Sequence, residues 1–468
     1  MKKKHIFISL SLLLIAAVMI GACAPAQAPA PEAPEEAEPA QEEPAEEAEV
    51  EELTPVEEWA RGVKDELGGT EIKVAAASHP STEAFKEMTP RFEELTGIKV
   101  VLDEMEEGAL GQKLILEMSA PTSDYDIIMS YPEAIPGMVD AEYLMPLDDY
   151  IQDPSLTPDW YDYEDILQPY RDMMAIDAKH YAVPFAGETV FLFYRCDLFD
   201  EHGIEVPTTM DELKEAAAYF QENVEGVAGI SWRTRVGWEM TYMWSVFIFP
   251  FGGEMLDPTM TTPGFTKPET KASLQYMIDM MEYAPPGVES FSFPEAWDAF
   301  MQGKTAMMVE ASAAAPEVEN PEKSVVAGNV CYAPMPAGPA GAYSGVWGWG
   351  YGIPDKSEKK EAAYTYMMYT TSKAMQDEYI ENGGIVSRTS YLENPDKQAE
   401  FPYYQTIIDT LEQAAALMEK GYSVVIPIPE WNTLSEIAGT EGGKALVGQQ
   451  TVDEAAEKIQ TQVEEILP

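Results

Sequence analysis

Hydrophobic residues recur along the chain in short apolar runs that alternate with helical repeats. The run Glu71–Ala77 is short and mostly apolar, as expected of a strand. Over Ser81–Leu95 the apolar residues take helical spacing, and Thr96-Gly97 ends this helix. The same alternation continues with a strand, a helix and a strand at Ile98–Leu102, Gly111–Ala120 and Asp126–Ser130. Strands and helices in this order over about 60 residues predict a parallel sheet of the α/β class.

The carboxyl ends of these strands are the expected place for a binding site. In an open α/β sheet, ligands bind in the crevice outside the carboxyl ends of the strands. The residues directly after the first strand are His79–Thr82, with Ser81 among them. The third strand ends in Ser130 and Tyr131. These residues are therefore candidates to line a ligand cavity.

Further strands and helices are expected along the rest of the chain. Thr209 is placed to cap a helix over Thr209–Asn223, with Glu212 three positions on as in a capping box. The other predicted helices are Glu295–Gln302, Lys359–Thr370 and Val452–Leu467, and the other predicted strands are Thr305–Val309, Asn329–Pro334 and Val346–Pro354. The part of the chain after its N-terminal segment is about 410 residues long, which suggests two domains or two interleaved lobes.

The N-terminus carries an export signal. Three lysines, the apolar run Ile6–Ile20 and the small residues Gly21 and Ala22 precede Cys23. The run is too short for a membrane-spanning helix, which needs about 20 apolar residues. The ending Ile-Gly-Ala-Cys resembles a bacterial lipobox, in which the cysteine thiol receives a diacylglyceryl group. We expect residues 1–22 to be a signal peptide and Cys23 to anchor the protein by lipid to the cell membrane, outside the cytoplasm. An ordinary secretory signal with a chance cysteine is the alternative.

A segment rich in Pro, Ala and Glu follows the cysteine. Residues 24–58 hold 13 glutamates and neither Lys nor Arg. Low hydrophobicity, like charges and proline prevent such a segment from packing a core. We therefore interpret residues 23–58 as the lipidated cysteine and a disordered linker that holds the rest of the protein away from the membrane. A cleaved or functionless tail is the alternative.

The charge of the chain narrows the classes of molecule that it can bind. The chain has 82 acidic and 29 basic residues and a net charge of −53, which argues against nucleic acid, because phosphate contacts need Lys and Arg. It argues more weakly against anionic ligands.

Besides Cys23, the cysteines are Cys196 and Cys331. A disulfide between them is possible in an exported protein, but both lie in apolar, strand-like stretches, which favours two buried free thiols.

Motifs for catalysis are scarce. The sequence has no HExxH, no GxSxG and no EF-hand loop. The segment GTEGGKA (439–445) resembles a phosphate loop only superficially, because its spacing is wrong and Ala445 stands where Ser or Thr would hold magnesium. Four histidines are few for metal binding or acid–base chemistry. We therefore predict no enzyme activity, no metal and no cofactor.

Tryptophans beside glycine or proline are the strongest candidates for ligand contacts. In Trp347-Gly348-Trp349-Gly350 the two indoles would face the same side of a strand. Trp431 follows a proline-containing turn and precedes a helix. Aromatic faces can stack on the apolar faces of sugars while neighbouring polar groups bind the hydroxyls. Packing in a hydrophobic core is the alternative for each ring.

Seven segments, in order, resemble the extracellular solute-binding proteins of ABC importers, in the carbohydrate-binding group that is similar to maltose-binding protein. They are PRFEELTGIKV (90–100), SDYDIIMSYP (123–132), YAVPFAGETVFLFYRCDLFDEHGIEVPTTMDELKEAA (181–217), AFMQGKTAMMVE (299–310), GVWGWGYGIPDKSEKKEAAYTYMMYTTS (345–372), GGIVSRTSYL (383–392) and VDEAAEKIQTQVEEIL (452–467). Each segment is weakly specific alone, and the ordered set spans nearly the whole chain after the linker, from residue 90 to residue 467.

The resemblance implies a two-lobed periplasmic-binding-protein fold of type II, with a hinge between two α/β lobes. Lobe one would hold residues 59–183 and 329–355, and lobe two would hold 184–328 and 356–468. A ligand would bind between the lobes and favour their closure, since only the closed state lets both lobes touch it. The closed monomer would then dock on the transmembrane permease subunits of an ABC transporter.

The resemblance also assigns ligand contacts to individual residues. Glu188 matches an acid that contacts ligand in relatives, and Trp431 matches a late aromatic that stacks on sugar. The Gly-Trp-Gly strand offers Trp347 or Trp349, and the turn GGIVSR offers Arg388, for which a structural salt bridge is the equal alternative. Trp232 and Trp238 lie in a region that commonly donates a ring to the ligand. Relatives carry a Gly and then a Trp after TAMMVE, but here Glu310 is followed by Ala-Ser-Ala, so Glu310 is expected to offer a carboxylate instead.

We therefore predict a lipid-anchored carbohydrate receptor of an ABC importer, with a sugar, oligosaccharide or polyol as its ligand. A receptor for a polyamine, an osmolyte amine or a peptide is the first alternative. A cleft lined by several carboxylates around an aromatic box would favour that alternative. A surface enzyme acting on polysaccharide is the second, and it predicts two close carboxylates, one with a raised pKa, in an open groove.

Overall fold

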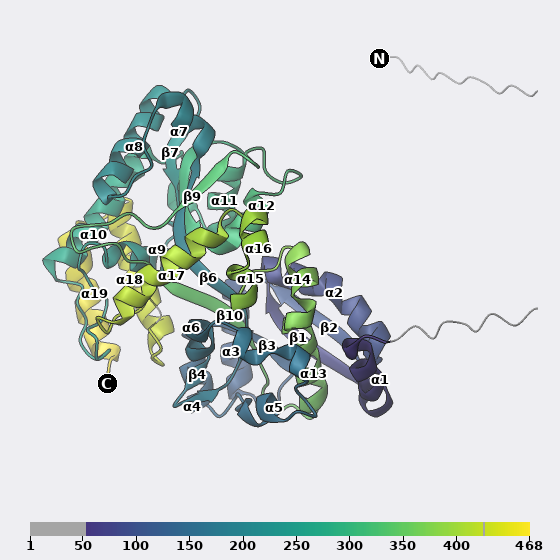
Figure 1. The fold of residues 1–468 in the computed structure, drawn as a ribbon. Helices are drawn as coiled ribbons and strands as arrows, with labels where there is room; N and C mark the ends of the chain where they lie inside the picture. The colour runs from purple at the N-terminus through teal and green to yellow at the C-terminus, as the bar shows by residue number, and fades with distance from the viewer. Residues whose placement is uncertain (1–52, 425) are drawn as a thin grey trace, which may run out of the picture. The chain divides into compact units, whose positions relative to one another are not determined.

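The computed structural model describes residues 53–424 and 426–468 (Figure 1). The predicted signal peptide (1–22), the lipidation site Cys23 and most of the predicted linker lie outside the described residues. The linker does not extend to residue 58 as predicted, because helix α1 (Pro55–Leu67) begins before it. Thr54 starts this helix with a capping box, in which its hydroxyl accepts the N–H of Glu57 at 3.3 Å and its own N–H donates to the Glu57 carboxylate at 2.8 Å.

Four neighbouring strands form the sheet of lobe one. β1 (Glu71–Ala77) lies between β2 (Lys99–Met105) and β3 (Ile127–Ser130), and both pairs are parallel. β10 (Val346–Gly352) then pairs with β3 in the antiparallel direction. The parallel α/β sheet predicted from the first three strands is confirmed.

The long strand β6 (Val183–Arg195) belongs to both lobes. Its first part pairs antiparallel with β10, and its second part pairs antiparallel with β8 (Thr305–Ala311) and β9 (Val330–Ala333). β7 (Ala228–Ser231) lies parallel to β8. The strand order is therefore β2-β1-β3-β10-β6-β8-β7, with β9 also paired to β6. The second part of β6 with β7, β8 and β9 is the sheet of lobe two. A separate hairpin pairs β4 (Ala175–Ile176) with β5 (Lys179–His180).

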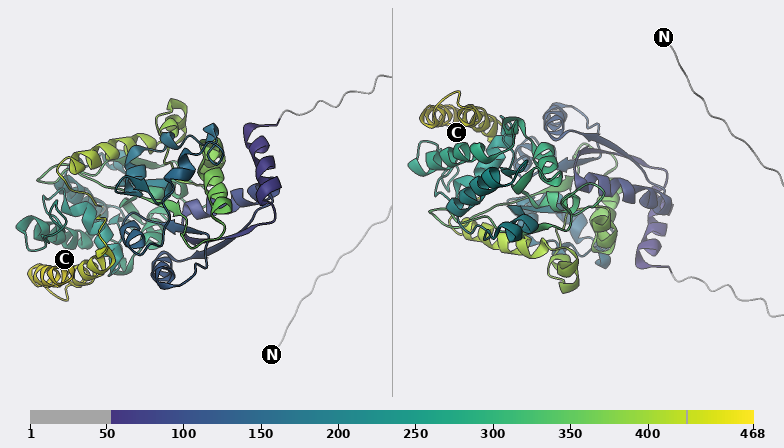
Figure 2. Two further views of the ribbon diagram at one scale, coloured as in Figure 1. Left: turned by 90° about the horizontal axis from the view of Figure 1, so that it is seen from below. Right: turned by 90° about the horizontal axis from the view of Figure 1, so that it is seen from above.

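Helices cover the sheet of each lobe (Figures 1 and 2). Before β6 the helices are α1, α2 (Pro80–Thr96), α3 (Glu107–Ser119), α4 (Ile135–Asp140), α5 (Asp148–Gln152) and α6 (Gln168–Met173). Between β6 and β9 they are α7 (Cys196–His202), α8 (Met210–Asn223), α9 (Trp238–Ile248), α10 (Pro268–Met280), α11 (Phe293–Met301) and α12 (Ala315–Val318). After β10 they are α13 (Lys360–Thr371), α14 (Gln376–Glu381), α15 (Thr389–Leu392), α16 (Pro395–Glu400), α17 (Tyr404–Met418), α18 (Trp431–Leu446) and α19 (Val452–Ile466). No helix in the described part of the chain is long and apolar enough to cross a membrane.

Two buried hydrophobic clusters support the two lobes. The first surrounds β1, β3, α2 and α13, and the second lies among α8, α9, α10 and α18. Successive residues of β6 point to opposite faces of the sheet, so that Phe191 and Phe193 join the first cluster while Val190 and Leu192 join the second. Because both clusters take side chains from this one strand, β6 connects the lobes physically. The fold is the predicted two-lobed α/β fold.

Parts of two segments lie in the opposite lobe from the one predicted. Residues 329–355 are predicted in lobe one, but β9 pairs with the end of β6 in lobe two. Residues 356–468 are predicted in lobe two, but α13 packs on α2 in lobe one, where the hydroxyls of Tyr366 and Thr89 lie 2.8 Å apart. Strands and helices of both lobes are apolar on their buried faces, so the hydrophobic pattern cannot assign them to a lobe.

Cys196 and Cys331 form a disulfide bond, so the prediction of two free thiols is wrong. Antiparallel pairing of β6 with β9 places Tyr194 opposite Cys331. Cys196 follows β6 directly, and the Cα atoms of the two cysteines lie 5.5 Å apart, within the usual range for a disulfide. The sequence alone cannot reveal this proximity, because 135 residues separate the two cysteines.

Candidate functional site

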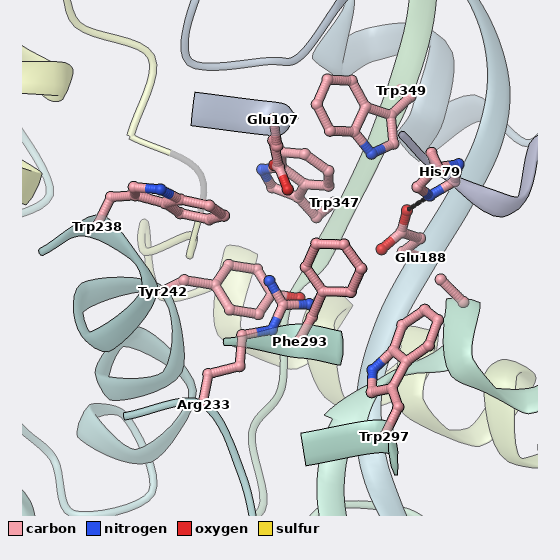
Figure 3. A pocket seen from close by; sticks show the side chains of 11 residues that line it. His79, Glu107, Glu188, Arg233, Trp238, Tyr242, Phe293, Trp297, Trp347 and Trp349 are labelled. Carbon is pink, nitrogen blue, oxygen red and sulfur yellow. Dashed lines mark hydrogen bonds and ion pairs between the residues drawn. The ribbon is translucent and has the colours of Figure 1, made fainter. Parts of the chain in front are cut away.

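Two adjoining chambers lie between the lobes. The inner chamber is lined by His79, Glu107, Glu188, Arg233, Trp238, Tyr242, Phe293, Trp297, Ala313, Trp347 and Trp349 (Figure 3). The outer chamber is lined by Glu106, Glu107, Gly108, Ala109, Gly111, Gln112, Ile115, Tyr131, Glu133, Arg235, Trp238, Tyr242, Trp347, Trp431, Asn432, Ser435 and Glu436. Four residues belong to both linings, so the chambers adjoin each other. The inner chamber encloses about 390 Å³ of empty space, its open mouth included.

Both lobes supply walls to the inner chamber. Lobe one contributes His79, which follows β1, together with the two tryptophans of β10. Lobe two contributes Arg233, which follows β7, and the rings of helices α9 and α11. Glu188 comes from β6, the strand that connects the lobes. A ligand here would therefore touch both lobes at once.

His79 and Glu188 form a buried pair on one side of the inner chamber. The Nε2 atom of His79 lies 3.2 Å from Oε1 of Glu188 (Figure 3). The other ring nitrogen, Nδ1, accepts the backbone N–H of Ser81 at 3.1 Å, because His79 is the N-cap of α2. Since Nδ1 must be unprotonated to accept this bond, the ring proton of neutral His79 is on Nε2 and is donated to Glu188. The second carboxylate oxygen of Glu188 remains able to accept a hydrogen bond from a ligand.

Arg233 places a fixed positive charge opposite that pair. Its Nε and Nη2 atoms donate to the Glu310 carboxylate at distances from 2.7 to 3.0 Å, and its Nη1 atom lies 3.5 Å from Glu239. The guanidinium also lies 4.4 Å from the ring centre of Tyr242. Burial alone would lower the pKa of Arg233, but Glu310 raises it well above the usual value. The side chain is therefore held charged and oriented.

Aromatic rings form most of the remaining wall. Trp347 and Trp349 lie perpendicular to each other, with ring centres 4.9 Å apart, and both face the inner chamber as their spacing predicts (Figure 3). Gly348 between them packs closely on β6, since a Cβ atom there would lie 2.3 Å from the carbonyl oxygen of Ala186. Tyr131 stacks on Trp347 with ring centres 6.2 Å apart. The close strand packing thus fixes the indoles as a rigid platform.

Two further carboxyl groups have unusual pKa values. Burial raises the pKa of Glu107 to about 8; Arg233 opposes this rise, and Glu239 and Glu188 add to it. Burial raises the pKa of Glu133 to about 7, although hydrogen bonds from its own backbone and from Trp347 lower it. The indole N–H of Trp347 lies 2.9 and 3.0 Å from the two carboxylate oxygens of Glu133. Near neutral pH both groups are protonated to a large extent and can donate as well as accept.

The structure places six of the ten predicted ligand contacts in the two chambers. They are Glu188, Trp349, Trp347, Trp238, Tyr131 and Trp431. Trp238 and Trp431 are the first residues of helices α9 and α18, whose positions bring both rings to the cavity. The remaining four predicted residues have other surroundings.

Those four residues lie behind the cavity or away from it. Ser81 is fully buried, and its hydroxyl accepts a hydrogen bond from Tyr379 at 2.6 Å. Glu310 is fully buried against Arg233 and therefore acts on the chamber only through that residue. Trp232 packs in the hydrophobic cluster of lobe two. Arg388 donates to the carbonyl oxygens of Thr371 and Asp162 in lobe one, which agrees with a structural role.

Sequence reasoning missed six residues of the inner chamber, which are Glu107, Arg233, Tyr242, Phe293, Trp297 and Ala313. Phe293 and Trp297 lie one helical turn apart on α11 and supply rings beside Ala313, where relatives were expected to carry a Trp. The indole N–H of Trp297 is buried and has no hydrogen-bond partner. The four-residue spacing of Phe293 and Trp297 was visible in the sequence, but it is equally typical of a core-facing helix.

The arrangement suits the binding of a small molecule. Carboxylates that accept, N–H groups that donate and aromatic faces meet in one enclosed space. Within the described residues, no group of three or more His, Cys, Asp or Glu side chains is arranged to hold a metal ion. The inner chamber can therefore surround a small molecule that has polar groups of both kinds and some apolar surface.

Comparison with known proteins agrees with this geometry. A family model described as bacterial extracellular solute-binding protein matches residues 76–377. The mannitol-binding protein of Pseudomonas aeruginosa is 27% identical over 369 residues, which are 75% of this chain and 82% of that protein. A solute-binding protein of Agrobacterium vitis, solved with bound D-mannitol, is 30% identical with a TM-score of 0.76, covering 85% of this chain and 98% of that one. One from Agrobacterium radiobacter, solved with ribitol, is 25% identical with a TM-score of 0.79, covering 86% and 99%.

Proposed function

The chain belongs to the bacterial extracellular solute-binding proteins, and from this premise we propose that it is a receptor for a neutral polyol or small sugar. The ligand binds in the inner chamber, between the lobes, and holds them closed. The loaded protein then delivers it to the permease subunits of an ABC transporter. It acts as a monomer outside the cytoplasm, and the lipid on Cys23 keeps it near the permease.

The observation that carries this proposal is the match between donors and acceptors in the inner chamber. Glu188 presents an acceptor oxygen, while Arg233 and the unpartnered indole N–H of Trp297 present donors. A hydroxyl group both donates and accepts, so neighbouring hydroxyls of a polyol can bridge these groups. The aromatic walls then cover the C–H surface of the same molecule.

The fixed charges disfavour ionic ligands. A phosphate or carboxylate would lie beside Glu188 and be repelled by it. An ammonium group would face Arg233, whose charge Glu310 maintains. A neutral ligand is repelled neither by Glu188 nor by Arg233. The named ligands of the similar proteins, mannitol and ribitol, have this chemistry.

A small amine is the second candidate. Five carboxyl groups line the two chambers beside the rings, those of Glu106, Glu107, Glu133, Glu188 and Glu436. A quaternary ammonium group could lie against those rings through cation–π contacts. Arg233 already covers the face of Tyr242 with its own cation, which makes this candidate the weaker one.

The proposal is tested by titration calorimetry of the full chain against ligands of separate classes. D-mannitol, ribitol and D-glucose represent neutral polyols and sugars; sorbitol 6-phosphate, spermidine, glycine betaine and a tripeptide represent the ionic classes. We expect at least one neutral polyol or sugar to bind with a stoichiometry of one. Binding by an amine or peptide alone would overturn the proposal.

A pair of matched substitutions locates the binding. Trp347→Ala removes a ring of the chamber, and Trp232→Ala removes a buried ring outside it. We expect Trp347→Ala to lower the affinity by about fivefold or more, because stacking on a ring contributes roughly 1 kcal/mol or more. Trp232→Ala should lower stability and leave the affinity of the folded protein unchanged. If both variants bound the ligand with equal affinity, the ligand would not bind in the inner chamber.

A further inference from the structure

Helix α9 carries two of the rings that line the inner chamber. Trp238 is its first residue and Tyr242 lies about one turn further, and both rings point from the helix toward the chamber (Figure 3). The position of the first turn of α9 therefore decides where the ring of Trp238 lies. The contacts that fix this turn matter for binding even where they lie outside the chamber.

The first turn of α9 depends on the backbone of Gly237. The carbonyl oxygen of this residue accepts the N–H groups of Met240 at 3.1 Å and of Thr241 at 3.4 Å, which are hydrogen bonds of the first helical turn. Gly237 has φ 108° and ψ −155°, a conformation that is almost confined to glycine. The Gly237 carbonyl thus holds the turn that begins with Trp238.

Helix α18 packs directly against this carbonyl through Gly439. A Cβ atom on Gly439 would lie 1.8 Å from the carbonyl oxygen of Gly237 and 2.8 Å from Oγ1 of Thr241. The first distance is far below the roughly 3.5 Å at which non-bonded heavy atoms attract each other, so a side chain at position 439 would push the two helices apart. Oγ1 of Thr241 also donates to the carbonyl oxygen of Ser435 at 2.6 Å, which fixes α9 along α18.

The glycine-rich segment 439–445 therefore has a role in packing that its sequence did not reveal. A Cβ atom on Gly442 would lie 3.2 Å from Cε of Met240, and one on Gly443 would also meet a side-chain atom first. The end of a flexible side chain such as Met240 can move aside. Gly439 instead meets the backbone carbonyl that holds the first turn of α9, and that carbonyl cannot move without moving the turn.

We propose that Gly439 is a positioning residue for ligand binding, because its lack of a side chain lets α18 hold the Gly237 carbonyl, and with it the ring of Trp238, in place at the chamber. This inference rests on the proposed function, since it takes the ligand to be a neutral polyol or small sugar in the inner chamber. Gly439 itself lines neither chamber. A methyl group at this position changes binding by moving α9, and it offers no contact to the ligand.

The test measures ligand affinity by titration calorimetry of the full chain. The probe is whichever of D-mannitol, ribitol and D-glucose the unchanged protein binds most tightly. We expect Gly439→Ala to bind the probe about fivefold or more weakly, since displacement of Trp238 removes a ring contact from the ligand. Gly442→Ala is the matched change in the same helix, and it should keep the affinity of the unchanged protein because Met240 can move aside.

A double-mutant cycle with Trp238 separates positioning from a general effect on the fold. If Gly439 acts through this ring, Gly439→Ala should lower the affinity no further once Trp238→Ala has removed the ring. A merely structural effect would lower the affinity equally with and without the ring. Gly338→Ala is the control for strain, since a Cβ atom there would lie 2.3 Å from the carbonyl oxygen of Pro250. This variant should unfold at a lower urea concentration and keep its affinity.

Thr241→Val replaces Gly439→Ala in this cycle if the latter fails to fold. It removes the hydroxyl that bonds to Ser435 and adds no bulk between the helices. We expect it to weaken binding by about twofold or more where Trp238 is present, since one hydrogen bond makes a modest net contribution, and to have no effect on affinity where Trp238 is absent.

Two results would overturn the inference and leave the proposed function standing. In one, the folded variant binds the probe as tightly as the unchanged protein. In the other, the variant loses affinity to the same extent with and without Trp238. If the unchanged protein bound none of the three probes, the proposed function would be contradicted, and the inference with it.

Discussion

Buried polar residues of the inner chamber are held by partners outside it. Glu188 accepts a hydrogen bond from His79 Nε2–H, and His79 is in turn fixed by the backbone N–H of Ser81. Arg233 is fixed in the same way by Glu310. Each ligand-facing group therefore has a set orientation before ligand arrives, which lowers the entropy lost on binding.

Replacement of His79 tests this orientation of Glu188. The change His79→Asn keeps a side chain that can cap α2 but is too short to hold Glu188. We expect the affinity for the polyol to fall by about five- to tenfold, since a net hydrogen bond contributes about 1 kcal/mol. Titration calorimetry measures this loss, and the melting temperature should change little.

His202→Asn is the matched control, because His202 lies next to Tyr219 in lobe two and lines neither chamber. Its affinity should equal that of the unchanged protein. A His79→Asn variant that binds as tightly as this control would show that Glu188 needs no support.

Glu133 makes stability depend on pH. Its pKa is about 7 in the folded protein and near 4.5 when unfolded, so the folded state holds the proton more tightly. The contribution of this group to the free energy of unfolding is largest below pH 4.5 and falls as the pH rises to about 7. Above that pH the contribution stays at its lowest value. The loss amounts to about 3 kcal/mol, since one pKa unit corresponds to about 1.4 kcal/mol.

The change Glu133→Gln removes this titration and keeps an acceptor for the Trp347 indole. We expect the variant to exceed the unchanged protein in stability by up to about 3 kcal/mol at pH 8 and to match it at pH 4. Urea unfolding at the two pH values measures the difference. Glu412→Gln on the exposed face of α17 is the control. A Glu133→Gln variant with the same pH dependence as this control would contradict the account.

At the scale of secondary structure, the pattern of apolar residues predicted the elements that carry the site. The strand Glu71–Ala77 was predicted with the observed ends, and Thr209 and Glu212 form the predicted capping box. Trp347 and Trp349 face one side of β10 as their spacing required. These features depend on neighbours in the sequence, which is why local patterns reveal them.

Contacts between distant segments could not be predicted in this way. Arg233 is a site residue because β7 lies beside β8 and brings it to Glu310, 77 residues away. The lobe that holds β9 depends on its pairing with β6, and the disulfide depends on the same pairing. Neither composition nor periodicity carries this information. The resemblance to a family supplied the two-lobed fold but not these details.

The disulfide ties β9 to the end of β6. It closes a loop of 135 residues, and the chain-entropy estimate for such a loop is about 5 kcal/mol, with measured values more often 2–4 kcal/mol. We expect the double variant Cys196→Ser/Cys331→Ser to lose about 2–5 kcal/mol of unfolding free energy. Guanidinium unfolding without reductant measures this loss. Reductant should destabilise the unchanged protein and not the variant; equal stabilities of both proteins without reductant would contradict the prediction.

Across the whole molecule, the binding site exists only where the two lobes meet. Lobe one brings His79 and the β10 tryptophans, and lobe two brings Arg233 and the rings of α9 and α11. The lobes share β6, so they can move relative to each other while the sheet stays continuous. A ligand that touches both lobes favours their closure, because it gains contacts from the second lobe only in that state.

The central claim is that a neutral polyhydroxy molecule binds between Glu188 and Arg233. A crystal structure of the full chain grown with the tightest-binding polyol tests it most directly. We predict ligand density in the inner chamber, with one hydroxyl donating to Glu188, another accepting from Arg233, and carbon atoms packed on Trp347 and Trp349. Density for the polyol outside the inner chamber, or an inner chamber filled by an amine or an anion, would contradict the account.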